Sequence, residues 1–114
     1  MRERWNESPF WYIQLGMNRE QIIETLRAHE PDLRNRGVLH AALFGSVARG
    51  DTKSPSDIDI LIELEPDAPI SLFDYIGITH YLADLFPIRV DVANLSKLKP
   101  HVRPGAEHDA VYAF

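Results

Sequence analysis

The chain has 114 residues, 45% of them hydrophobic and 25% charged, which predicts one folded domain with a modest core. Its 17 acidic and 12 basic residues give a net charge of −5, which argues against a general nucleic-acid-binding protein, because such proteins carry a basic face. The sequence holds no cysteine, which excludes disulfides, thiolate zinc sites and cysteine nucleophiles. It has no apolar run of membrane-spanning length and no signal peptide, so we expect a cytoplasmic protein.

The first sixteen residues differ from the rest of the chain. Met1–Gly16 mixes charged residues with two tryptophans, a phenylalanine and a tyrosine, and it shows no helical or strand period. We expect a disordered or loosely docked extension, with an aromatic arm that packs on a partner as the alternative. Met17 stands just before a helix start and is a second candidate for the first residue. Residues 17–114 are expected to form the folded domain.

Two short helices are expected after this extension. Asn18 is a good N-cap, and Gln21 completes a capping box three residues later. An apolar stripe at helical spacing follows. Pro31 interrupts this helix, because the residue before a proline disfavours the helical conformation. A second short helix is expected to end at Gly37.

Two strands and two loops should come next. Val38–Phe44 is an uncharged, apolar run and predicts a buried strand. Gly45–Ser56 is rich in glycine, serine, proline and aspartate, and predicts a turn or loop. Asp57–Leu64 begins with alternating acidic and aliphatic residues, then becomes mainly apolar, and predicts a second strand. Glu65–Ile70 contains two prolines and predicts a loop.

A longer helix and a third strand are expected in the second half. Ser71 is a good N-cap, with Asp74 three residues later. The buried face of this helix is expected to comprise Leu72, Tyr75, Ile76, Thr79, Leu82, Ala83 and Phe86. Pro87 should end the helix, and Ile88–Ala93 predicts a strand.

The order of the elements predicts an α/β or α+β fold. Lys97–Phe114 should contain a short helical segment that starts afresh at Pro104, since a proline inside a helix costs about 3 kcal/mol. We expect a small mixed sheet of about three core strands, with helices on one side and acidic residues on the other. The length leaves no room for a second folded domain.

Two acidic residues open the second expected strand. Asp57 and Asp59 are two positions apart, so they should lie on one face of the strand, about 6–7 Å apart. Two such carboxylates repel each other unless a cation lies between them, and rigidly held oxygen ligands suit Mg²⁺. Asp91 is a third candidate, provided that its strand lies beside the second one.

A Gly-Ser pair follows the first expected strand directly. Gly45 lets the backbone approach a phosphate, Ser46 offers a hydroxyl and an N–H, and Arg49 can bind phosphate through two hydrogen bonds. Metal-binding carboxylates beside such a turn make a nucleotidyl-transfer site, where two metal ions activate the attacking oxygen and stabilise the leaving pyrophosphate. Each feature alone has an ordinary explanation as a turn, a solvated strand edge or a surface charge. Their combination supports the site.

Other polar residues support no additional site. None of the five histidines has a partner at zinc-binding spacing: His29, His40, His80, His101 and His108. A small basic cluster predicts a solvated face rather than an RNA or phosphate contact: Lys97, Lys99, His101 and Arg103. The sequence has no Walker A motif, so the nucleotide would be held by metal, Ser46 and Arg49.

The motifs resemble those of the DNA polymerase β-like nucleotidyltransferase superfamily, in which an apolar-Gly-Gly/Ser turn precedes Asp-apolar-Asp by about a dozen residues. More narrowly, the chain is similar to the minimal nucleotidyltransferases, the MntA-like antitoxins of HEPN/MNT systems. The matching segments are Gly45-Ser46-Val47-Ala48-Arg49-Gly50, Ser71-Leu72-Phe73-Asp74, Leu98-Lys99-Pro100 and Ala110-Val111-Tyr112. The resemblance covers residues 17–112. Met1–Gly16 and Arg103-Pro104-Gly105 depart from the family pattern.

The resemblance implies a polymerase-β-like fold and a Mg²⁺-dependent enzyme that takes AMP from ATP. Asp57, Asp59 and Asp91 would be the catalytic and metal-binding acids, and Gly45, Ser46 and Arg49 would bind the nucleotide. The implied acceptor is a tyrosine of a partner HEPN ribonuclease toxin. Because the chain is too short for a second domain, the acceptor site would come from a partner or from another copy of the chain. We expect this protein to contact neither a membrane nor nucleic acid directly. Two alternatives are an antitoxin that acts by binding alone and a small-molecule adenylyltransferase. The resemblance is compatible with either a homo-oligomer or a hetero-oligomer.

Overall fold

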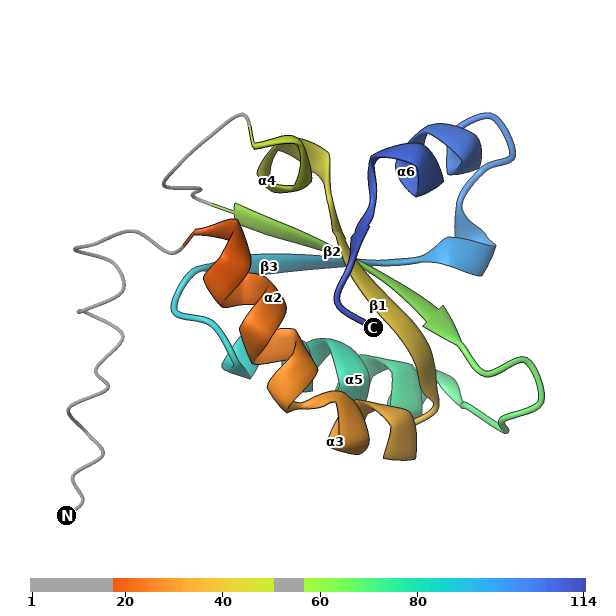
Figure 1. The fold of residues 1–114 in the computed structure, drawn as a ribbon. Helices are drawn as coiled ribbons and strands as arrows, with labels where there is room; N and C mark the ends of the chain where they lie inside the picture. Colours follow the sequence, from red (N-terminus) through yellow and green to blue (C-terminus); the bar gives the residue numbers. More distant parts are fainter. Residues whose placement is uncertain (1–17, 51–56) are drawn as a thin grey trace, which may run out of the picture.

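A computed structural model describes residues 18–50 and 57–114, so the expectations for Met1–Gly16, for Met17 and for the second half of the Gly45–Ser56 loop lie outside the described residues. The elements in chain order (Figure 1) are α2 (Arg19–Ala28), α3 (Glu30–Asn35), β1 (Val38–Phe44), α4 (Gly45–Arg49), β2 (Asp57–Leu64), α5 (Leu72–Asp84), β3 (Arg89–Asn94), the 3₁₀ turn η2 (Leu95–Lys97), α6 (Arg103–Asp109) and β4 (Val111–Tyr112). No helix in these ranges is long and apolar enough to cross a membrane.

The strands form one mixed sheet in the order β3-β2-β1-β4. β1 is antiparallel to both β2 and β4, whereas β2 and β3 are parallel. The predicted α/β class with a small mixed sheet is therefore confirmed, with one additional strand. The sequence did not predict β4, because two residues are too few to show an alternating pattern. The end of the chain continues along β1, where the Ala113 N–H donates to the Ala41 carbonyl at 2.8 Å.

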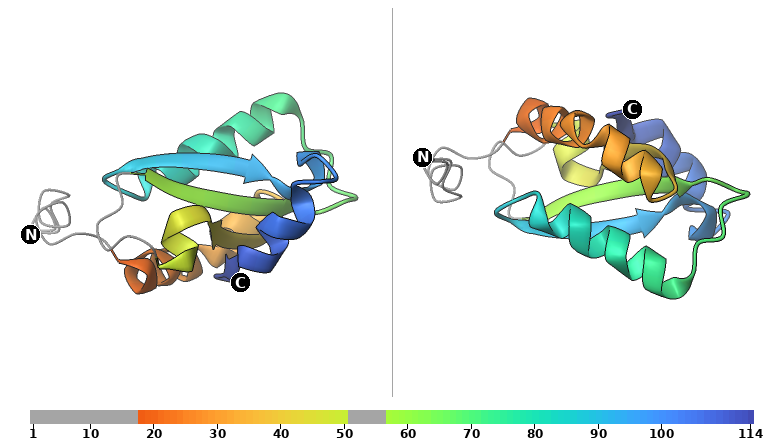
Figure 2. Two further views of the ribbon diagram at one scale, coloured as in Figure 1. Left: turned by 90° about the horizontal axis from the view of Figure 1, so that it is seen from above. Right: turned by 90° about the horizontal axis from the view of Figure 1, so that it is seen from below.

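The helices divide between the two faces of the sheet, so the expectation that they lie on one side only was wrong. α2, α3 and α5 lie on one face, and α4 and α6 lie on the other (Figure 1), as the views from above and below also show (Figure 2). Alternate residues of β2 bury their side chains completely under the first group: Ile58, Ile60 and Ile62. They join the main core with Leu26 of α2 and Leu82 of α5. The other face of β2 begins with acidic residues, as expected from the alternation of side chains along a strand.

Both predicted capping boxes are present. The Gln21 N–H donates to Asn18 Oδ1 at 2.9 Å, and the Asn18 N–H donates to Gln21 Oε1 at 2.9 Å. Ser71 and Asp74 exchange the equivalent bonds at the start of α5. These reciprocal bonds satisfy backbone N–H groups that would otherwise lack partners at a helix start, so the sequence alone locates both starts.

The prediction that residues 45–56 form only a loop was wrong in its first part. Gly45–Arg49 is the short helix α4, and Val47 and Ala48 are almost completely buried. The turn residues on either side hid this helix from sequence reasoning. Burial against the core stabilises a five-residue helix that would be marginal by itself in water.

The predicted buried face of α5 was partly wrong. Ile78 and Leu82 are buried and Tyr75 is half-buried, whereas Leu72, Ile76 and Ala83 are exposed. α5 is apolar around much of its circumference, so periodicity did not single out one face. The position of the sheet selected the face, which leaves apolar side chains at the start of the helix in solvent.

The C-terminal helix α6 begins near the predicted place. It starts at Arg103, and Pro104 lies in its first turn, where a proline removes no helical hydrogen bond. The preceding 3₁₀ turn η2 was not predicted. Its Leu95 is buried, and it follows directly from the end of β3.

Candidate active site

The strand register brings the predicted acidic residues together on the sheet face that carries α4 and α6. In the parallel pair of β2 and β3, Asp57 lies opposite Arg89 and Asp59 lies opposite Asp91. Neighbouring strands are about 4.8 Å apart, so the backbones of Asp59 and Asp91 are near neighbours. Asp57 shares their face because it is two residues from Asp59. The condition set for Asp91 by sequence reasoning is therefore met.

The electrostatics of Asp59 reflect the two carboxylates beside it. Partial burial raises the pKa of Asp59 above its ordinary value of 3.8, and the negative charges of Asp91 and Asp57 raise it further. A carboxylate whose ionised form is disfavoured in this way gains from a nearby cation. Repulsion between these acids is the feature that a divalent cation would relieve.

Gly45 lies directly against Asp59. Phe44, the last residue of β1, is paired with Asp59, and Gly45 follows with a φ of +76°. A Cβ atom at Gly45 would lie 2.6 Å from Oδ2 of Asp59, which is closer than two such atoms can approach. Glycine is required here both by the left-handed backbone and by the adjacent carboxylate. The predicted turn and the predicted acids therefore belong to one site.

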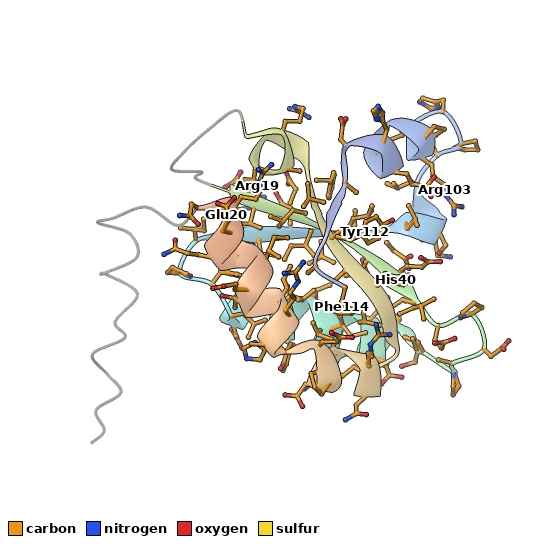
Figure 3. The ribbon with its side chains drawn as sticks, in the orientation of Figure 1. Arg19, Glu20, His40, Arg103, Tyr112 and Phe114 are labelled. Carbon is orange, nitrogen blue, oxygen red and sulfur yellow. The ribbon has the colours of Figure 1, made fainter. Side chains whose placement is uncertain are left out.

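Arg49 ends α4 and lies between two helices. Its Nη1 is 3.7 Å from Oδ2 of Asp109 in α6, an ion pair whose partners are each about half exposed. α4 is held from the other side by Arg19, whose Nη1 donates to the Ala48 carbonyl at 2.8 Å (Figure 3). Ser46 lies in the same helix. The backbone of the predicted phosphate-binding residues is thus fixed beside Asp59.

Arg89 is a charged residue of this face to which sequence reasoning gave no role. It lies opposite Asp57 in the register, and its Nη2 is 3.4 Å from Oδ1 of Asp91. The available signal was its position two residues before Asp91, which places both side chains on one face of a strand. A guanidinium therefore lies among the acids and offsets part of their charge.

The donor set suits a hard cation, although the side chains are not gathered around a single point. Carboxylate oxygens are the ligands that Mg²⁺ prefers, and substrate phosphates and water commonly complete its shell. Within residues 18–50 and 57–114, no three histidine, aspartate or glutamate side chains are grouped closely enough to hold a metal ion. A shared ion would require these carboxylates to move closer together.

Asp59→Asn should raise the melting temperature at neutral pH when no divalent cation is present. Because the pKa of Asp59 is raised in the folded state, its ionised form destabilises that state at any pH above the raised pKa. The stability advantage of the variant should shrink as the pH falls through this pKa. It should vanish below pH 3.8, where Asp59 of the wild type is protonated in both the folded and the unfolded chain. Thermal denaturation across this range tests it, and a variant less stable than wild type at neutral pH would contradict it.

Comparison with known proteins agrees with the geometry. Residues 19–113 match the family model of the nucleotidyltransferase domain. The protein adenylyltransferase MntA of Thermococcus cleftensis is 39% identical over 94 residues, covering 82% of this chain and 93% of that protein. A Methanocaldococcus jannaschii protein, named as a candidate protein adenylyltransferase, is 40% identical over 94 residues, covering 81% of this chain and 94% of its own length.

Solved structures show the same fold. A candidate minimal nucleotidyltransferase superposes with a TM-score of 0.62 at 30% identity, covering 83% of this chain and 95% of that chain. The fold recurs at 16% identity, with a TM-score of 0.56, in a complex of a tri-AMPylated Shewanella oneidensis HEPN toxin with its MNT antitoxin, covering 81% of this chain and 71% of that chain. The resemblance drawn from the motifs is confirmed: this chain belongs to the nucleotidyltransferase domain family, among its minimal, MntA-like members.

Proposed function

We propose that the protein is a Mg²⁺-dependent adenylyltransferase that moves AMP from ATP to a hydroxyl group of a protein. The observation that carries this proposal is the placement of Asp57, Asp59 and Asp91 on one sheet face, with Gly45 against Asp59. A solvated strand edge has no need for this close approach. The name of the Thermococcus cleftensis relative supports a protein as the acceptor.

Each acid has a proposed role. Asp57 and Asp59 would hold Mg²⁺, which when bound neutralises charge on the transferred phosphate and on the leaving pyrophosphate. Asp91 would accept the proton of the attacking hydroxyl, since it neighbours Asp59 and is about half exposed to an incoming acceptor. Arg89 would hold the Asp91 carboxylate in position until the acceptor arrives.

The triphosphate would lie beside α4. Gly45 brings the start of α4 directly against Asp59, and Ser46 and Arg49 would contact phosphate oxygens. Arg49 would exchange its ion pair with Asp109 for one with the triphosphate, so α6 would adjust when the nucleotide binds. The position of these residues directly after β1 supports this assignment.

Ser46→Ala combined with Arg49→Ala should weaken ATP binding in the presence of Mg²⁺. Each lost hydrogen bond to a charged group contributes about 1.5–3 kcal/mol, so the dissociation constant should rise by about tenfold to about 150-fold for each contact. Calorimetric titration with a non-hydrolysable ATP analogue measures this. Arg36→Ala provides the control, because Arg36 directly follows α3, on the face of the sheet opposite α4. An unchanged constant in the double variant would remove both residues from the phosphate site.

The proposed acceptor is a tyrosine of a HEPN-domain toxin that this protein silences. The MntA name of a 39% identical relative supports this partner, as does the tri-AMPylated toxin described for the Shewanella oneidensis complex. A cytoplasmic location would fit a toxin that cleaves cellular RNA. The competing function is neutralisation of the toxin by binding alone. The two functions differ in whether the toxin is covalently modified.

We expect catalytic amounts of the protein, with ATP and Mg²⁺, to inactivate an excess of its cognate HEPN toxin. A transferase leaves a covalent mark and leaves the product free to dissociate, whereas an inhibitor that only binds must be present at about one copy per toxin. Intact-mass spectrometry should show the toxin gaining one or more AMP units. Peptide mapping should then place them on tyrosine.

The Asp57→Asn/Asp59→Asn double variant is the matched control for this experiment. It should bind the toxin and yet fail to modify it. If the double variant protects as well as wild type does, and the toxin mass never changes, then the protein acts by binding and the proposed transfer is wrong.

A further inference from the structure

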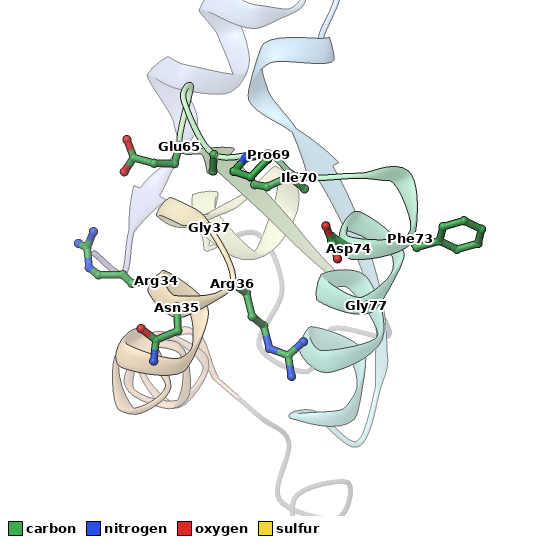
Figure 4. A pocket seen from close by; sticks show the side chains of 11 residues that line it. Arg34, Asn35, Arg36, Gly37, Glu65, Pro69, Ile70, Phe73, Asp74 and Gly77 are labelled. Carbon is green, nitrogen blue, oxygen red and sulfur yellow. The ribbon is translucent and has the colours of Figure 1, made fainter.

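An apolar ridge projects into solvent at the start of α5. Leu72 and Phe73, the first two residues of the helix, are 71% and 83% exposed, and Ile76 extends the ridge with 41% exposure. Figure 4 shows the Phe73 ring pointing away from the body of the molecule. The Ser71–Asp74 capping box fixes this helix start, so the backbone that carries the two side chains is held in place.

An apolar groove of about 430 Å³ lies beside this ridge. Its lining is mostly apolar, with a lysine and two small polar residues: Leu64, Ile70, Leu72, Tyr75, Ser71, Asn94 and Lys97. The volume is more than ten times the roughly 30 Å³ occupied by one water molecule, so the groove has room for an aromatic ring. Leu72 belongs both to the ridge and to the groove wall, which makes the two features direct neighbours.

We propose that this surface pairs with a second copy of the chain by reciprocal insertion of Phe73. A two-fold interface uses the same patch on both copies, so the patch must be complementary to itself. A ridge that adjoins a groove meets this condition. A two-fold axis close to Leu72 places each Phe73 in the groove of the other copy, and it buries Leu72 at the centre.

The charges around the patch complement one another in the same arrangement. Asp74 follows Phe73, and Lys97 lines the groove, so each inserted ring brings an aspartate toward a lysine of the other copy. Hydrogen bonds from the backbone and side chain of Ser71 lower the pKa of Asp74, which is therefore ionised at neutral pH. Residues 95–102 contain two lysines and no acidic residue, although the chain as a whole has a net charge of −5.

A second groove on the opposite side of the ridge is less suited to an apolar side chain. Its lining carries mixed charge, with Arg34, Arg36, Glu65 and Asp74 around a volume of about 520 Å³ (Figure 4). Inserting a phenyl ring there would remove these charged groups from water without replacing their hydrogen bonds. The apolar groove is therefore the one that receives Phe73.

The pairing surface lies far from the acidic site. Leu64, at the groove, ends β2, whereas Asp57 opens it. Seven residues at about 3.3 Å each separate the two ends by about 23 Å. Both acidic sites of the pair would therefore stay open to nucleotide and acceptor, and the pairing does not depend on the proposed transfer activity.

Sedimentation velocity of the full chain, from about 1 to about 200 µM, tests the proposal, because small interfaces with few anchoring side chains give micromolar dissociation constants. The wild type should show a concentration-dependent dimer. Phe73→Ala removes both inserted rings of a dimer, so at the roughly 30-fold effect typical of one interface hot spot it should raise the dimer dissociation constant by about 900-fold in all. Val102→Ala, which shortens an exposed apolar side chain on neither groove, should leave the constant unchanged. Melting curves show whether each variant is folded.

Single-cysteine crosslinking gives an independent measurement, since the chain has no cysteine of its own. Leu72→Cys should form an intermolecular disulfide under mild oxidation, because Leu72 would lie near the two-fold axis, whereas Val102→Cys should not. A wild type that stays monomeric at the highest concentration would overturn the proposal. So would self-association that Phe73→Ala leaves unchanged, or a groove that binds a different protein while the chain alone stays monomeric.

Discussion

Asp57→Asn and Asp59→Asn should each lower adenylyl transfer by more than about 100-fold while leaving the fold intact. Even the groups that orient metal ligands typically contribute 10- to 100-fold, and these two carboxylates are the proposed ligands themselves. The fold should survive, because Asp57 is exposed and removing the charge of Asp59 relieves repulsion from Asp91. Transfer of labelled AMP from ATP to the cognate toxin, with Mg²⁺, measures the effect.

Asp84→Asn is a suitable control for these variants, since it removes an exposed carboxylate at the end of α5, which covers the face of the sheet opposite the acids. It should transfer AMP at the wild-type rate. Near-wild-type transfer by both Asp57→Asn and Asp59→Asn would refute the catalytic assignment. Melting curves show whether each variant is folded, so a loss of transfer counts as a catalytic effect only in a variant that melts like the wild type.

Gly45→Ala should lower transfer by about 100-fold, although position 45 makes no proposed chemical contribution through a side chain. The added Cβ would lie 2.6 Å from Oδ2 of Asp59, so the carboxylate must move to accommodate it. The tip of a side chain moves at little cost in stability, but a displacement of about 1 Å in an active site can lower the rate about 100-fold. The same transfer assay, with Mg²⁺ in excess, measures the loss.

Gly50→Ala separates this displacement from backbone strain. Gly50 has the same φ of +76°, so alanine at either position should destabilise the protein by about 1–2 kcal/mol. A Cβ at Gly50 meets no atom within 4 Å among the described residues, so this variant should keep most of its activity. Equal loss of activity in the two variants would show that strain, rather than the contact with Asp59, accounts for the effect.

Local sequence determined where two of the helices begin and which residues are candidates for the chemistry. The capping boxes at Asn18 and Ser71 depend on residues three positions apart, so they are legible without the fold. The same holds for the shared face of Asp57 and Asp59, since side chains alternate along any strand. The Gly-Ser turn and the Asp-x-Asp pair are equally local, which is why the family could be identified from them.

The tertiary structure decided everything that depends on contacts between distant segments. Only the parallel register of β2 and β3 shows that Asp91 and Arg89 join the acidic site, because strand order is not encoded in either strand alone. The helix α4 forms because the core buries Val47 and Ala48, which overrides a turn-forming sequence. α5 is apolar on several sides, so only the position of the sheet could decide that Ile78 is buried while Leu72 and Ile76 remain in solvent.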